Sequence, residues 1–303
     1  MRPIVFKLCL PALCGAAFAA SSPALAAPRP SPAWYVTTPS IRTAFHHGCA
    51  TGRNHHRGGV LLLFGGPSGT SGTLLVGSNR FMRLFRSVKI AAAFGGGYYS
   101  CLAQRYRARH YRIRLIMASN NSTGSNVSHA SGRAWGRTVR QAAAAFAGTR
   151  VGRHVVVSGG SDLEPGFGPV GLARDWVRGF TGATGRGMYN VGSADGCPQR
   201  PVVGDGACNN GWHQSDIWAF SRGIPTTGAL PEIYYSANAI QWASISRFGA
   251  RHRRRGAIRF AGALSEHQAN AATLTADQSW SALSQATGQR PSWSAALRAI
   301  ASW

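Results

Sequence analysis

The stretch Val60-Leu61-Leu62-Leu63-Phe64, stopped by Gly65-Gly66-Pro67, decides the fold class of this 303-residue chain. A short, continuous apolar run that ends at glycine and proline is typical of a β-strand buried on both faces. Strands with one face in water alternate apolar and polar residues instead. The stretch therefore predicts a strand inside a sheet that is covered on both sides.

The same theme recurs along the chain after this stretch. Strands are expected at residues 60–64, 113–118, 154–158, 187–191, 230–235 and 258–261. Helices are expected after them, at about 81–98 (interrupted at Gly95-Gly96-Gly97), 133–146, 172–180, 212–220, 238–248 and 279–286. Strands that alternate with helices predict a parallel sheet wrapped by helices.

Six such units favour a (β/α) TIM-like barrel, irregular or incomplete, since a complete barrel of this class has eight. One missing unit could precede Val60, and another could lie between Trp293 and Trp303. An open, doubly wound sheet is the alternative. However, neither a dinucleotide-binding glycine fingerprint nor a P-loop lysine follows the first strand. Nucleotide binding is therefore not expected.

The first 26 residues have the features of a secretory signal peptide. Arg2 and Lys7 precede the apolar run 8–20, and Ala24-Leu25-Ala26 offers a cleavage site. The run is too short to span a bilayer, so an uncleaved anchor is the weaker alternative. We predict a signal peptide at 1–26, an irregular lead-in at 27–58, and a single barrel domain at 59–303. The mature protein is expected to be secreted and monomeric, with no transmembrane segment.

Four cysteines remain after signal removal: Cys49, Cys101, Cys197 and Cys208. An even number in an exported chain predicts two disulfides. Three pairings are open; we favour Cys197–Cys208, which closes a short loop, with Cys49–Cys101 as the other. Zinc is the weaker alternative, because no C-x-x-C pair is present and the lead-in histidines have no carboxylate nearby in sequence. No metal or cofactor is expected.

Basic residues outnumber acidic residues by 33 to 9, and every acidic residue lies at or after Asp162. A net charge of +24 attracts anionic material, although an arginine-rich composition without a function is the alternative. Charge alone reads no base sequence, so no specific nucleic-acid partner is expected. The expected partner is a polysaccharide or an anionic cell-wall polymer.

Acidic residues follow the predicted strands at the end where a barrel of this class has its active site. Asp162 and Glu164 are two residues apart, so on a strand their side chains share a face. Two close carboxylates cannot both ionise freely, and the protonated one can protonate a leaving oxygen. We predict Glu164 as proton donor, Asp162 as its electrostatic partner, and Asp195 or Glu232 as the opposing carboxylate of a glycoside hydrolase.

Tyr234, Asn190, Trp212 and Trp242 are the predicted substrate-binding residues. Tyr234 shares the face of Glu232, and the tryptophans could stack on sugar rings. A purely structural role is the alternative for these residues. The carboxylates could neutralise arginines or form buried ion pairs, and tryptophans are more often core residues.

Five motifs occur in fixed order: Ser161-Asp162-Leu163-Glu164-Pro165, residues 189–198 (YNVGSADGCP), Cys208-Asn209-Asn210-Gly211-Trp212, Leu230-Pro231-Glu232-Ile233-Tyr234 and residues 260–266 (FAGALSE). Together they resemble a family of secreted actinobacterial proteins of glycoside-hydrolase-like barrel type, itself largely uncharacterised. The resemblance spans about residues 59–290. A more distant similarity to cell-wall-cleaving, lysozyme-like barrels rests on Asp162 and Glu164, which match their catalytic D-x-E strand. This resemblance implies a barrel that cleaves a cell-wall or related polysaccharide. The alternative is a non-catalytic barrel that binds an anionic envelope polymer.

Overall fold

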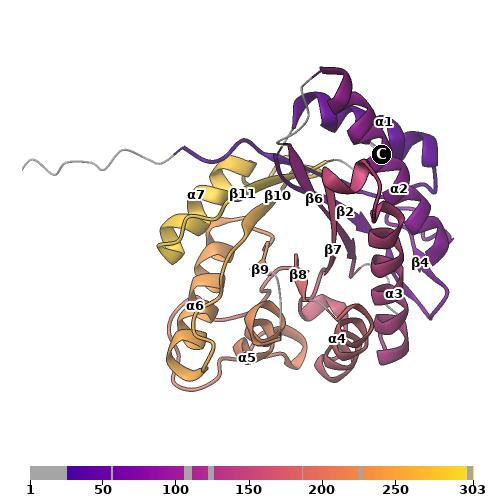
Figure 1. Cartoon of the computed structure of the whole chain (residues 1–303). Coiled ribbons are helices and arrows are strands. Elements are labelled where there is room, and N and C mark those ends of the chain that lie inside the picture. Colours follow the sequence, from indigo (N-terminus) through magenta and orange to yellow (C-terminus); the bar gives the residue numbers. More distant parts are fainter. Residues whose placement is uncertain are drawn as a thin grey trace, which may run out of the picture.

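The computed structural model describes residues 26–55, 57–105, 111–121, 126–185, 187–224, 228–298 and 303. The predicted signal peptide lies outside them, apart from Ala26. Helices surround a central sheet of eight parallel strands (Figure 1). The strands, in spatial order, are β10 (Gly262–Gln268), β11 (Trp293–Arg298), β1 (Ser31–Tyr35), β2 (Arg57–Phe64), β6 (Arg112–Ser119), β7 (Val155–Ser161), β8 (Met188–Asn190) and β9 (Gly228–Ala229).

The two edges of this sheet, β9 and β10, meet through a few backbone contacts. Parallel bridges join Ala229 to Phe260 and Glu232 to Leu264. The Ile233 N–H donates to the Leu264 carbonyl oxygen at 2.9 Å. The sheet is therefore a nearly closed barrel, which confirms the predicted TIM-like architecture and not the open-sheet alternative. The helices are α1 (Ile41–Asn54), α2 (Leu84–Arg105), α3 (His129–Phe146), α4 (Val170–Thr184), α5 (Gln214–Trp218), α6 (Ser236–His252) and α7 (Ala276–Thr287).

Residues 27–58 are not the irregular lead-in that the sequence predicted. They hold β1, which pairs with both β11 and β2, and α1, which begins at a Ser40 side chain that accepts a hydrogen bond from the Thr43 N–H. Together with β11 near the C-terminal end, β1 supplies the two strands that the six visible units lacked. The composition hid α1, because Ser, His and Gly are weak helix formers.

Glycines in α1 and α2 serve helix packing and do not interrupt either helix. A Cβ at Gly48 of α1 would come within 1.9 Å of the Phe94 carbonyl oxygen, and one at Gly97 of α2 within 2.0 Å of the Phe45 carbonyl oxygen. The two helices therefore approach so closely that only glycine fits at the contact. The predicted break at residues 95–97 is wrong, since α2 runs unbroken from Leu84 to Arg105.

The last strands differ from their predicted positions. Residues 230–235 were expected to be a strand, but β9 is only Gly228–Ala229, and Pro231 supplies no N–H for a ladder. The strand expected at 258–261 instead begins at Gly262. The helix expected at 212–220 is divided into α5 and a π-helical turn, Ala219–Gly223.

Buried side chains form two clusters, one inside the barrel and one between strands and helices. Leu61 and Leu63 of β2 face the barrel interior, whereas Val60, Leu62 and Phe64 pack against the helices. This is the two-sided burial that the apolar run predicted. After β2, a three-stranded antiparallel sheet follows, formed by β3 (Gly66–Ser68), β4 (Gly72–Leu74) and β5 (Phe81–Arg83). No helix in the described part of the chain is both long and apolar enough to cross a bilayer.

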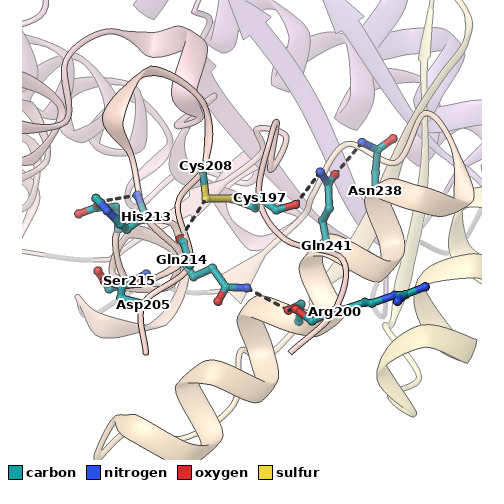
Figure 2. Close-up of a disulfide and its surroundings, with 12 residues drawn as sticks. Cys197, Arg200, Asp205, Cys208, His213, Gln214, Ser215, Asn238 and Gln241 are labelled. Carbon is teal, nitrogen blue, oxygen red and sulfur yellow. Dashed lines mark hydrogen bonds and ion pairs between the residues drawn. A yellow bond between two sulfur atoms is a disulfide. The ribbon is translucent and has the colours of Figure 1, made fainter. Parts of the chain in front are cut away.

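Two disulfides confirm the favoured pairing. Cys49–Cys101 joins α1 to α2, and Cys197–Cys208 closes the loop after β8. Figure 2 shows how this loop is fixed to α6: the Gln241 side-chain amide donates to the Cys197 carbonyl oxygen at 3.0 Å. The disulfide loop is thus fixed on the side of the barrel where β8 ends.

Candidate functional site

Asp162 and Glu164 lie just beyond the C-terminal end of β7 and point to the same side. Gly160 faces the barrel interior, because a Cβ there would contact Ile116 and Ala118, and Leu163 packs in the outer cluster. Alternation along the chain therefore turns Asp162 and Glu164 inward. A 3₁₀ turn begins at Pro165, yet the Glu164 side chain is only 6 % exposed. The proline does not swing it to the surface.

Glu232 completes a trio with these two residues. One carboxylate oxygen from each of Asp162, Glu164 and Glu232 lies within 4.8 Å of the others. Glu232 is brought there by the bridge to Leu264 that helps to close the barrel. Asp162 and Glu232 are both 2 % exposed. The trio therefore occupies the mouth of the barrel, which we define as the end where the strands finish.

The trio has no ion-pair partner among the described residues. There, the acidic residues that form salt bridges are Asp175 and Asp216, at α4 and α5. In a chain of net charge +24, the absence of a guanidinium beside three buried carboxyl groups is informative. The described residues therefore contradict the alternative in which these carboxyl groups neutralise arginines or form buried ion pairs.

Neutral donors surround the trio instead. Asp162 Oδ2 accepts from the Asn120 side chain at 3.2 Å and lies 3.4 Å from the Asn121 backbone nitrogen. Glu164 accepts from the Asn121 side chain at Oε1 and from the Ser193 N–H at Oε2, at 2.8 Å. The other oxygen of Asp162, Oδ1, is buried without a hydrogen-bond partner in the described structure. It is free to receive a proton or a ligand donor.

Burial dominates the electrostatics of the trio. It raises the pKa of Asp162 well above its ordinary value, and the nearby Glu164 charge raises this pKa further. Burial likewise raises the pKa of Glu232 well above normal, with Asp162 as the next cause. The pKa of Glu164 is also raised by burial, while hydrogen bonds from Ser193 and Asn121 oppose the shift. The trio thus holds protons that an exposed carboxylate would lose.

Two tyrosines and a fourth carboxylate border the trio. The Tyr234 hydroxyl donates to Glu232, as their shared face predicted, and the Tyr35 hydroxyl donates to Glu266. Burial raises the pKa of Glu266, and the bond from Tyr35 opposes the shift. Glu266 and Tyr234 are half-buried, so they connect the trio to the surface.

Sequence reasoning missed Tyr35, because its strand lay within the supposed lead-in. Asn120 and Asn121 come just after the strand predicted at 113–118, but they were not predicted as members of a site. Glu266 was visible after the sixth predicted strand, but it had no neighbour at spacing two to mark it. Position at a strand end was the signal that could have found all four.

Asp195 and Asn190 have roles around the trio. Asp195 is half-buried after β8, lies outside the trio, and contributes to the raised pKa of Glu164. Asn190 is fully buried: its Oδ1 accepts from the Leu163 N–H at 3.2 Å and the Gly192 N–H at 3.1 Å. Asn190 therefore holds two mouth loops together, and the prediction that it binds substrate is wrong.

Trp212 and Trp242 are core residues. Both side chains are 0 % exposed, and the Trp212 indole N–H donates to the Gly168 carbonyl oxygen at 2.9 Å. Neither ring offers a face to a ligand, so the predicted stacking platforms are wrong. Trp212 belongs to one of the quoted motifs, and its ring packs inside the fold.

Three carboxyl groups whose oxygens lie this close can donate a proton, act as a nucleophile or bind a cation. Hard cations such as Ca²⁺ and Mg²⁺ prefer oxygen ligands, and the trio is the one such group of potential ligands in the described part of the chain. The sequence predicted no metal. A cation would bind the deprotonated carboxylates and would itself lower their raised pKa values, so the trio suits either a shared proton or a hard cation.

No protein-family model, curated protein or solved structure matches this chain. The resemblance to a secreted glycoside-hydrolase-like family stays a prediction that rests on the quoted motifs. The structure itself shows the barrel and the carboxylate trio at its mouth, and these two features support the functional proposal.

Proposed function

We propose that this protein is a secreted glycoside hydrolase that cleaves glycosidic bonds in a cell-wall or related polysaccharide. The observation that supports it is the trio: three carboxyl groups, buried, close together and without a basic partner among the described residues. Glycosidic cleavage needs one carboxylic acid to protonate the leaving oxygen and one carboxylate to act at the sugar carbon. Two disulfides and the signal-like N-terminal sequence favour an exported protein.

Glu164 is the proton donor in this proposal. Burial raises its pKa above the ordinary value of a glutamate, and the Ser193 and Asn121 hydrogen bonds oppose that shift. A catalytic acid works best when its pKa lies near the working pH, because it must both hold and release the proton. Asp162 then acts as the electrostatic partner whose charge state is linked to that of Glu164.

Glu232 is the opposing carboxylate. The Tyr234 hydroxyl orients it and stabilises its ionised form, and the positive charge that develops on the sugar ring favours that form further. Oxygens within 4.8 Å leave less room than the roughly 6.5–9.5 Å that inverting enzymes use to hold a water between their carboxyl groups. We therefore expect retention of anomeric configuration, with Glu232 as nucleophile.

The test is release of reducing sugar from peptidoglycan and a panel of neutral polysaccharides. Wild type is compared with Glu164→Gln, which keeps shape but cannot protonate, and with the matched Asp277→Asn, at an exposed acidic residue of α7. We expect activity in wild type and Asp277→Asn and a loss of at least about 100-fold in Glu164→Gln. Equal activity of all three would remove Glu164 from the mechanism, and no release from any substrate would refute hydrolysis.

A further inference from the structure

The barrel has a second distinctive end, its base, which we define as the segments that precede β1 or join a helix to the next strand, together with the first residue of each strand. None of the nine acidic residues lies in such a segment. Each acidic residue either follows a strand or lies in the second half of one, or it belongs to a helix. Those in helices lie in the first half of the helix or, in the short α5, at its middle. The mouth therefore holds the acidic residues, and the base has none.

Arginines are abundant at this base and exposed to solvent. Five of its segments carry exposed arginines: Arg29 before β1, Arg112 at the start of β6, Arg153 before β7, Arg254 and Arg259 before β10, and Arg290 before β11. Away from the base, Arg174 and Arg178 on α4 form salt bridges with Asp216 and Asp175. At the base the positive charges have no acidic neighbour in their own segments to offset them.

Crowding of like charges is visible at one point of the base. Arg222, just before β9, donates from Nε to the Arg255 carbonyl oxygen at 3.2 Å. Burial lowers the pKa of its guanidinium, and the charges of Arg259 and Arg255 lower it further. Such crowding costs free energy in the free protein, and an anion bound there would relieve it.

The base is also hollowed next to its arginines. A cavity of about 400 Å³ is lined by Arg112, Arg153 and the turn Gly148-Thr149. A second, of about 420 Å³, is lined by Arg29, Trp293 and other residues that surround the start of β1. These hollows give recesses for anionic groups beside guanidiniums, which pair with phosphate in two-pronged geometry.

We propose that the base of the barrel binds a phosphate-bearing chain polymer, independently of the chemistry at the mouth. A lipid surface fits less well, because peripheral binding to bilayers uses apolar side chains that insert below the headgroups. The large exposed apolar residues in the described structure, such as Phe85, Leu172 and Tyr235, lie at strand-to-helix connections or early in helices. The described base segments have none. Retention on the polymer would leave the mouth open to substrate.

The test compares two variants of the full mature chain with the same net charge. The base variant is R112Q/R153Q/R259Q/R290Q. The control, R42Q/R80Q/R83Q/R200Q, removes four exposed arginines on the mouth side. Binding of fluorescent long-chain inorganic polyphosphate is titrated between about 50 and 200 mM salt. Near-ultraviolet circular dichroism checks folding, and the double variants R112Q/R153Q and R259Q/R290Q repeat the test in smaller steps.

We expect wild type and control to bind with affinities within about threefold of each other, and the base variant to bind at least about tenfold more weakly. The slope of log K against log salt should fall by about 3, from roughly 0.7 for each of four lost contacts. Equal weakening in both variants would mean that only net charge matters and would overturn the proposal. So would an unweakened base variant, or wild type that binds anionic phospholipid vesicles but not polyphosphate.

Discussion

Replacing Gly192 with alanine should destabilise the protein and displace the trio, because the mouth has no room for a Cβ at this residue. That atom would lie 2.7 Å from Asp162 Oδ1 and 3.0 Å from both the Glu164 Cβ and the Leu163 carbonyl carbon. All three neighbours are buried, so none can move into solvent. Overpacking of this kind costs about 1–3 kcal/mol of unfolding free energy. A carboxylate shift approaching 1 Å would lower catalysis by about 100-fold.

Gly182→Ala is the matched control for this substitution. Gly182 is exposed within α4, and a Cβ there would meet nothing within 4 Å. Alanine favours a helix over glycine by about 0.5–1 kcal/mol, so this variant should be more stable than wild type and equally active. Urea unfolding and reducing-sugar release measure both effects. A Gly192→Ala variant as stable and active as Gly182→Ala would refute the packing of the trio against this loop.

Three further predictions follow from the same contacts. The folded state raises the pKa values of Asp162 and Glu232, so their protonated forms contribute to the stability of the fold. This contribution is complete below about pH 4. It is lost as the pH rises through the raised pKa values, by up to about 1.4 kcal/mol of unfolding free energy per pH unit for each group. Glu232→Gln should therefore flatten unfolding free energy against pH, and an unchanged slope would contradict the shift. The Cys49–Cys101 disulfide spans 52 residues and Cys197–Cys208 spans 11. In urea titrations, replacing both cysteines of the first with alanine should therefore lower the unfolding free energy by about 4 kcal/mol, and the same change in the second should lower it by about 3 kcal/mol. The reverse order would argue against chain entropy as the cause. Hydrolysis that uses only carboxyl groups should persist after dialysis against a chelator, and a loss restored by Ca²⁺ or Mg²⁺ would assign the trio to a metal.

Much of the fold was predictable, because two-sided apolar runs such as Val60–Phe64 mark barrel strands directly. The first and last strands were the weak points. β1 and α1 lie in a segment rich in Pro, Ser, His and Gly, and their stability comes from pairing with β2 and β11 and from the glycine contacts with α2. Contacts between segments this far apart in sequence leave no local pattern. The short β9 was misplaced for a similar reason, since closure rests on bridges at Ala229 and Glu232.

The site was predictable only where spacing carried the information. Asp162 and Glu164 share a face because they are two residues apart, and Glu232 and Tyr234 repeat this relation. The pairing of Tyr35 with Glu266 joins residues 231 positions apart and has no local signature. Trp212 and Trp242 were assigned wrongly, because a large aromatic residue looks the same in a sequence whether it faces a ligand or the core.

Titration of the carboxyl groups tests most directly whether the trio shares protons. The chain has nine acidic residues, few enough for each side-chain carboxyl carbon to be followed by ¹³C NMR in a labelled sample. We predict that at least one carboxyl group among Asp162, Glu164 and Glu232 remains protonated at about pH 7, because the pKa of each is raised. If all three carboxyl groups are ionised at about pH 7, the trio holds no proton there, and the acid that the proposed hydrolysis requires is absent.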